Sequence, residues 1–164
     1  MIENIKFQNA VDFYKNHHYE KAIKIFDDEF YINESKINFL KNSKCLIFNF
    51  KKYRSIIHYL NKILEINPAD PQILARKGHL LEITFQHQNA LLCINKALEI
   101  DSKNSLANYT KGIVLYNLEQ FEDSIECFNK ILETNPMDYS ASLGKGLCFE
   151  MLGMREDSVK YFVN

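Results

Sequence analysis

Large apolar residues recur along the chain at a fixed interval of 34 positions. An interval of this length is typical of repeat proteins, in which each repeat is one supersecondary element that packs mainly on its neighbours. The pattern therefore predicts a stack of similar repeats that share one continuous apolar core. Two of the apolar columns are Phe13, Ile47, Leu81, Leu115 and Phe149, and Phe26, Leu60, Ile94, Phe128 and Phe162.

Within one interval the apolar residues follow the helical period twice. In the segments 107–118 and 125–132 they fall on one side of a helix, as expected for helices that bury a single face. The polar pair Glu119 and Gln120 interrupts this pattern, and Gly153 occupies the matching region of the last repeat. Each repeat is therefore predicted to be a hairpin of two antiparallel helices.

The ends of the repeats carry residues that begin and end helices. Asp70, Asn104 and Asp138 stand one interval apart, where the next helix needs an N-cap. Pro68 and Pro136 are expected to end the preceding helices. These signals predict a single array over residues 1–164, with repeats at 3–36, 37–70, 71–104 and 105–138 and a partial repeat at 139–164.

The combined pattern resembles the tetratricopeptide repeat over nearly the whole chain. The resemblance rests on the interval, on Pro68 and Pro136, and on two columns of small residues. The repeat at 37–70 departs from it, with Lys44 and Ile56 at the two small positions. The resemblance implies an all-α fold, a right-handed superhelical α-solenoid of antiparallel helical hairpins with about five repeats. The small columns contain Ala10, Gly78, Gly112 and Gly146, and Ala22, Ala90, Ser124 and Ser158.

Charge and apolar runs narrow the classes of partner. The 164 residues include 20 Lys or Arg and 21 Asp or Glu, which gives a formal net charge of -1. Domains that bind nucleic acids usually carry a strong basic excess, so we expect no nucleic-acid partner. No run approaches the roughly 18 apolar residues of a membrane helix, and the N-terminus has no signal-peptide pattern. We therefore expect a cytoplasmic protein with no membrane partner.

The sequence contains no motif of a catalytic or cofactor site. The patterns GxGxxG, GxxxxGK[ST], GxSxG and HExxH are all absent. The four cysteines lack CxxC spacing, and we interpret them as reduced side chains that act as small apolar groups. We expect no enzyme activity, no cofactor and no metal ion. The cysteines are Cys45, Cys93, Cys127 and Cys148.

The resemblance implies a concave groove lined by the first helix of each repeat, which is the candidate binding site. Its positions mix amides, cations and aromatic groups, and amides can both donate to and accept from the backbone of an extended peptide. Lys41 and Arg76 predict a positive zone that would face an acidic side chain of the ligand. The groove residues that we single out are Asn38, Lys41, Asn42, Asn49, Arg76, His79, Tyr109, Thr110 and Asn117.

These features predict a noncatalytic scaffold or adaptor that binds an extended peptide or protein segment. Two alternatives stay open: a self-associating structural subunit, and a regulatory tetratricopeptide fragment of a larger multidomain protein. Self-association would use the C-terminal end, where Val159, Phe162 and Val163 have no evident polar capping helix after them. An RNA reader of the pentatricopeptide kind is opposed by the interval of 34 and by the nearly neutral charge.

Overall fold

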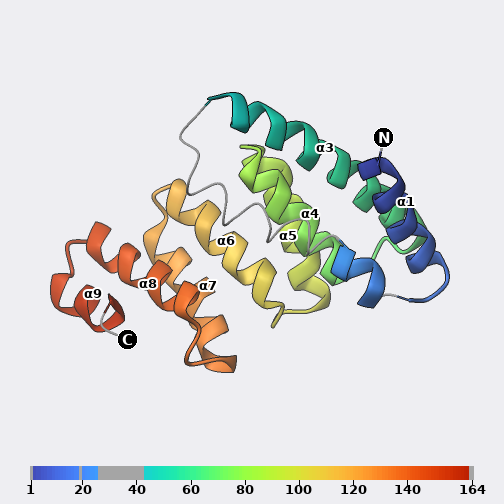
Figure 1. The fold of residues 1–164 in the computed structure, drawn as a ribbon. Helices are drawn as coiled ribbons and strands as arrows, with labels where there is room; N and C mark the ends of the chain where they lie inside the picture. The colour runs from blue at the N-terminus through green and yellow to red at the C-terminus, as the bar shows by residue number, and fades with distance from the viewer. Residues whose placement is uncertain (1, 19, 26–42, 163–164) are drawn as a thin grey trace. The chain divides into compact units, whose positions relative to one another are not determined.

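The computed structural model of the chain describes residues 2–18, 20–25 and 43–162, and gives side-chain surroundings for 5–18, 20–25 and 53–161. All regular structure within these ranges is helical, which confirms the predicted all-α class. The chain divides into two compact units, Met1–Ile73 and Leu74–Asn164. We describe each compact unit by itself (Figure 1).

The first compact unit contains α1 (Ile2–Lys15), a helical segment at 20–25, and α3 (Ser43–Ile66). Helix α1 packs on α3, and the ring centroids of Phe7 and Tyr59 lie 5.7 Å apart. Both rings are buried, as the helical spacing of apolar residues requires. The Tyr14 hydroxyl donates to the Asp70 carboxylate, which ties the end of α1 to the segment after α3.

Helix α3 departs from the predicted hairpin. It runs unbroken for 24 residues through Lys51, the position that aligns with the turns of the other repeats. The segment 50–54 reads FKKYR and contains no Gly, Pro, Asn or Asp, the residues that favour a turn. The aligned segment 84–88, TFQHQ, lacks the same residue types and still turns at Phe85, so local composition alone does not explain why the expected turn of the repeat at 37–70 is absent at this place.

The other hairpin turns share one backbone conformation. His17, Phe85, Glu119 and Gly153 have φ values of 61°, 60°, 62° and 75°, and they are separated by one or two intervals of 34. Each residue lies just after a first helix and reverses the chain toward the second. A left-handed conformation costs a residue with a side chain about 1–2 kcal/mol, so only Gly153 adopts it without strain.

The second compact unit is a succession of helix pairs. Helix α6 packs on α5, α7 and α8, and α8 packs on α7 and α9 (Figure 1). The first helices are α4 (Pro71–Ile83), which begins in the first compact unit, α6 (Ser105–Asn117) and α8 (Tyr139–Met151). The second helices are α5 (His87–Ile100), α7 (Phe121–Thr134) and α9 (Arg155–Phe162).

The predicted N-caps are confirmed at all three first helices. The Asp70 carboxylate accepts hydrogen bonds from the backbone nitrogens of Gln72 and Ile73 at 2.9 and 3.1 Å. Asn104 accepts one from the Ala107 nitrogen at 3.0 Å, and Asp138 accepts one from Ala141 at 2.9 Å. Each bond satisfies a backbone donor that has no partner within its helix.

Phe128 of α7 fills the space between α6 and α8. A Cβ added at Gly144 would lie 2.5 Å from its Cζ, and one added at Gly112 would lie 2.8 Å from it. These distances are shorter than van der Waals contact, so both positions require glycine while the ring stays in place. The Ser124 hydroxyl donates to the Gly112 carbonyl at 2.7 Å and so joins α7 to α6. Ser124 belongs to the second column of small residues.

Candidate functional site

The predicted groove residues within the second compact unit lie on two first helices. Arg76 and His79 are on α4, while Tyr109, Thr110 and Asn117 are on α6. We define the inner face as these five residues together with further residues on the same sides of α4, α6 and α8, which are named below. The others of the set cannot be placed: Asn38, Lys41 and Asn42 lie outside the described residues, and the side chain of Asn49 does as well. The inner face contains Arg76, His79, Glu82, Tyr109, Thr110, Ile113, Tyr116, Asn117, Leu143, Leu147, Glu150 and Met151.

Thr110 and His79 join α6 to α4. The fully buried Thr110 hydroxyl donates to the Leu106 carbonyl at 2.8 Å and lies 3.1 Å from His79 Nδ1. The tautomer of His79 decides which of the two groups donates in this second bond. Burial lowers the pKa of His79 to about 4, so the ring is neutral near pH 7.

A second polar network joins three helices around Glu82. Asn117 Nδ2 donates to Glu82 Oε1 at 3.0 Å, and His87 Nδ1 lies 2.7 Å from Glu82 Oε2. Glu82 is only 7% exposed, and its two partners satisfy both carboxylate oxygens. Sequence reasoning did not single out Glu82 or His87. The available signal was the position of Glu82, three residues after His79 on the same side of a predicted helix.

The exposed part of the inner face is largely apolar on α8. Leu143, Leu147 and Met151 follow one another at four-residue spacing, which places them on one side of the helix. We call these three residues the α8 stripe. Leu147 is 37% exposed and Met151 is 56% exposed, so their side chains are available for contact. Exposed apolar groups clustered in this way mark interaction surfaces more often than scattered ones do.

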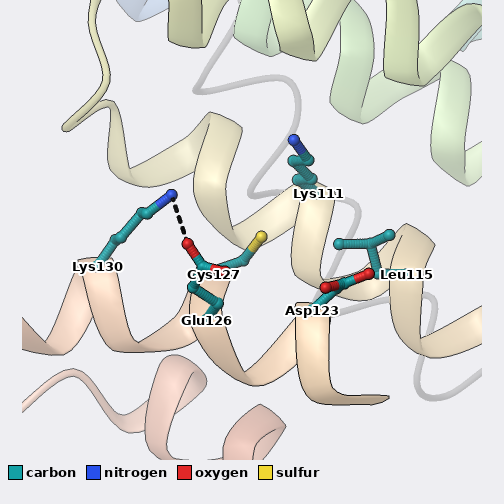
Figure 2. Close-up of a pocket in the computed structure, with 6 residues that line it drawn as sticks. All are labelled: Lys111, Leu115, Asp123, Glu126, Cys127 and Lys130. Atoms are coloured by element: carbon teal, nitrogen blue, oxygen red, sulfur yellow. Dashed lines mark ion pairs between the residues drawn. The ribbon is translucent and has the colours of Figure 1, made fainter. Parts of the chain in front are cut away.

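A cleft of about 370 Å³ lies between α6 and α7 and is shown in Figure 2. We call it the outer cleft. Lys130 Nζ pairs with Glu126 Oε1 across 3.3 Å, and the two side chains are 48% and 69% exposed. Two cations and two carboxylates share the cleft, so its charges balance. Burial raises the pKa of the Cys127 thiol, and the two neighbouring lysines only partly oppose this effect. The thiol is therefore protonated near pH 7 and a poor nucleophile. The lining residues are Lys111, Leu115, Asp123, Glu126, Cys127 and Lys130.

The lysine of each first helix lies beside the following second helix. Burial raises the pKa of the Cys93 and Cys127 thiols, and the nearby positive charges of Lys77 and Lys111 partly oppose this rise. Lys145 Nζ lies 4.7 Å from the centroid of the Tyr161 ring on α9, at cation–π distance. These lysines, one interval apart, place positive charge next to the second helices.

The described residues show no arrangement typical of a cofactor site. No group of three or more His, Cys, Asp or Glu side chains among them is placed to hold a metal ion. Cys93, Cys127 and Cys148 are free thiols, and the last two are buried as small apolar groups. None of the helices in the described ranges combines the length and apolar character needed to span a membrane.

Stacked helix pairs with capped first helices and a constant interval define a helical repeat protein of the α-solenoid class. Residues 71–104 and 106–137 match the family model of the tetratricopeptide repeat. Residues 71–104 and 106–137 are therefore tetratricopeptide repeats, as the sequence pattern predicted for this part of the chain.

Solved structures with similar folds confirm the predicted solenoid class. MamA matches with a TM-score of 0.63 at 20% identity, over 98% of this chain and 88% of that one. YrrB, described as a TPR protein with an unusual peptide-binding site, matches with 0.62 at 17% identity, over 95% and 80%. The TPR domain of Arabidopsis OM64 matches with 0.58 at 17% identity, over 63% and 85%. Comparison with curated proteins finds no match.

Proposed function

We propose that the protein is a noncatalytic scaffold or adaptor that binds an extended segment of a partner protein along its inner face. The observation that carries this proposal is the α8 stripe, an exposed apolar surface next to first helices that are joined by His79–Thr110 and Asn117–Glu82. A surface fixed in this way loses little freedom when a ligand binds, which favours affinity.

The proposed contact residues are the predicted groove set, extended by the α8 stripe. Arg76, on α4, would face an acidic side chain of the ligand. The similarity to YrrB supports a peptide as the ligand, since that protein has a peptide-binding site on a related fold. The set is Asn38, Lys41, Asn42, Asn49, Arg76, His79, Tyr109, Thr110 and Asn117, with Leu143, Leu147 and Met151.

A pull-down from native cell extract tests this function. The bait proteins are the unchanged chain, an Arg76→Glu/Tyr109→Ala variant, and a Lys111→Glu control that changes the outer cleft. We expect the control to retain the partners of the unchanged chain and the inner-face variant to lose them. Helix content and thermal unfolding of each bait are measured first, because Tyr109 packs near Phe128. An inner-face variant that is folded and retains the same partners would contradict the proposal.

A second candidate is self-association through α9. Val159 is 57% exposed on this helix, so its apolar side chain is available to a second copy of the chain. Light scattering at high protein concentration tests it, with Val159→Lys as the comparison. A strict monomer would remove this candidate, and dimers that disappear in the variant would support it.

A further inference from the structure

Several polar side chains of the inner face already have partners within the protein. Thr110 bonds to His79, and Asn117 bonds to Glu82, which also holds His87. A ligand that used these groups would have to replace an existing hydrogen bond, and such an exchange contributes little net affinity. We therefore expect the exposed apolar side chains of the same surface to contribute more to ligand affinity than these bonded polar groups do.

Large apolar side chains are exposed on α8 and in the turn after it. Leu147 and Met151 are 37% and 56% exposed, and Met154, in the turn after the helix, is 45% exposed. Methionine side chains are flexible and polarisable, so they adapt to apolar groups of different shapes. This part of the surface is suited to leucine, methionine or phenylalanine side chains of a partner.

One exposed carboxylate, that of Glu150, lies next to the α8 stripe. Helices α6 and α8 contain three charged residues: Lys111, Lys145 and Glu150. Lys111 lies in the outer cleft, and Lys145 lies over the ring of Tyr161. Glu150 is exposed, adjoins Met151 in the sequence, and follows Leu147 by three positions. A cation of the ligand would therefore find an opposite charge next to the apolar contact.

We propose that the α8 stripe and Glu150 select partner segments that combine large apolar side chains with a lysine or arginine. This inference rests on the proposed function and specifies the chemistry of the partner at the α6–α8 part of the inner face. The ligand would carry a Lys or Arg opposite Glu150, whereas it would carry an acidic side chain opposite Arg76. A partner that binds the whole face would carry its negative and positive groups at opposite ends.

Selection from a displayed library of random 12-residue peptides tests the inference. The targets are the full chain, a Leu147→Ser/Met151→Ser variant, a Glu150→Lys variant, and a Val159→Ser control. The control removes an exposed apolar side chain that lies outside the stripe. We expect peptides selected on the unchanged chain and on the control to contain two or more large apolar residues and at least one Lys or Arg.

The selected peptides are then synthesised, and their Kd values are measured by fluorescence anisotropy. We expect the Kd to rise about tenfold or more in the Leu147→Ser/Met151→Ser variant, because two apolar contacts are lost. For the Glu150→Lys variant, the Kd of basic peptides should rise, and selection on this variant should enrich acidic peptides. Equal Kd values for the unchanged chain, the Leu147→Ser/Met151→Ser variant and the Glu150→Lys variant would overturn the inference.

Two negative results have different meanings. Peptides that need Arg76 but tolerate the changes at Leu147, Met151 and Glu150 would overturn this inference and leave the proposed function intact. Absence of any peptide whose binding depends on an inner-face residue would overturn both. Enrichment of acidic peptides on the unchanged chain, with binding that is lost in the Leu147→Ser/Met151→Ser variant, would overturn only the inference.

Discussion

The inner face and the outer cleft of the second compact unit use similar polar groups in opposite surroundings. On the inner face, Glu82 is 7% exposed and holds Asn117 and His87 from two other helices. In the outer cleft, Lys130 and Glu126 pair within one helix while about half or more of each side chain contacts water. Buried polar contacts contribute to stability much more than exposed ion pairs do. The polar network around Glu82 therefore stabilises the packing of three helices, whereas the polar groups of the cleft remain solvated.

The largest expected effect concerns Phe128, which lies behind the inner face and connects its helices. Phe128→Ala should lower the free energy of unfolding by about 3–5 kcal/mol, because it leaves a cavity between α6 and α8. Urea unfolding followed by circular dichroism measures this change. Gly144→Ala is the matched overpacking variant and should cost about 1–3 kcal/mol. A loss below about 1 kcal/mol for Phe128→Ala would show that the helices can close on the cavity.

The next effect is a pH dependence caused by His79. The folded-state pKa is lowered to about 4 from the ordinary value of 6.5. Between these values the unfolded chain binds a proton at His79 and the folded chain does not, so stability is lost as the pH falls. Above pH 7 the ring is neutral in both states and contributes no pH dependence. We expect a loss of about 2 kcal/mol between pH 7.5 and 4.5 that is specific to this residue.

Urea unfolding of the unchanged chain and of His79→Gln at both pH values measures that loss. The variant should lose less stability than the unchanged chain over the same range, since the other titrating groups are common to both. Identical pH dependence in the two proteins would mean that His79 is protonated in the folded state, contrary to its burial beside Thr110.

The smallest effects compare the two polar networks directly. Glu82→Ala should lower the free energy of unfolding by about 1–2 kcal/mol, because its hydrogen bonds to Asn117 and His87 are lost. Lys130→Met in the outer cleft should change it by about 0.5 kcal/mol or less. Both variants are measured by urea unfolding at pH 7.5. Equal losses in the two variants would remove the distinction between the two surfaces.

The fold followed from local signals that recur in the sequence. Asp70, Asn104 and Asp138 cap helices as predicted, because an N-cap bonds to backbone nitrogens only two or three residues away. The turn expected near Lys51 was wrong, because α3 continues through this position. The repeat boundaries, the partner class and the cytoplasmic location stay predictions.

The candidate site was less predictable. Thr110 and Asn117 have the donors and acceptors that a peptide backbone needs, and the sequence indicated this chemistry. Their bonds to His79 and Glu82 cross 31 and 35 positions of the chain, so they depend on how neighbouring repeats pack. The available signal was the position of both partners on the first helix of the preceding repeat.

The sequence by itself determined the repeat interval, the helix pairs from Pro71 onward and the N-caps of their first helices, because each of these depends on periodic packing or on nearby backbone groups. Only the tertiary structure decided which side chains of the inner face are already bonded and which stay exposed. A polar group bonds to whichever partner lies at hydrogen-bond distance in space, and that distance is set by the packing of helices. The same packing leaves Leu147, Met151 and Glu150 exposed on α8.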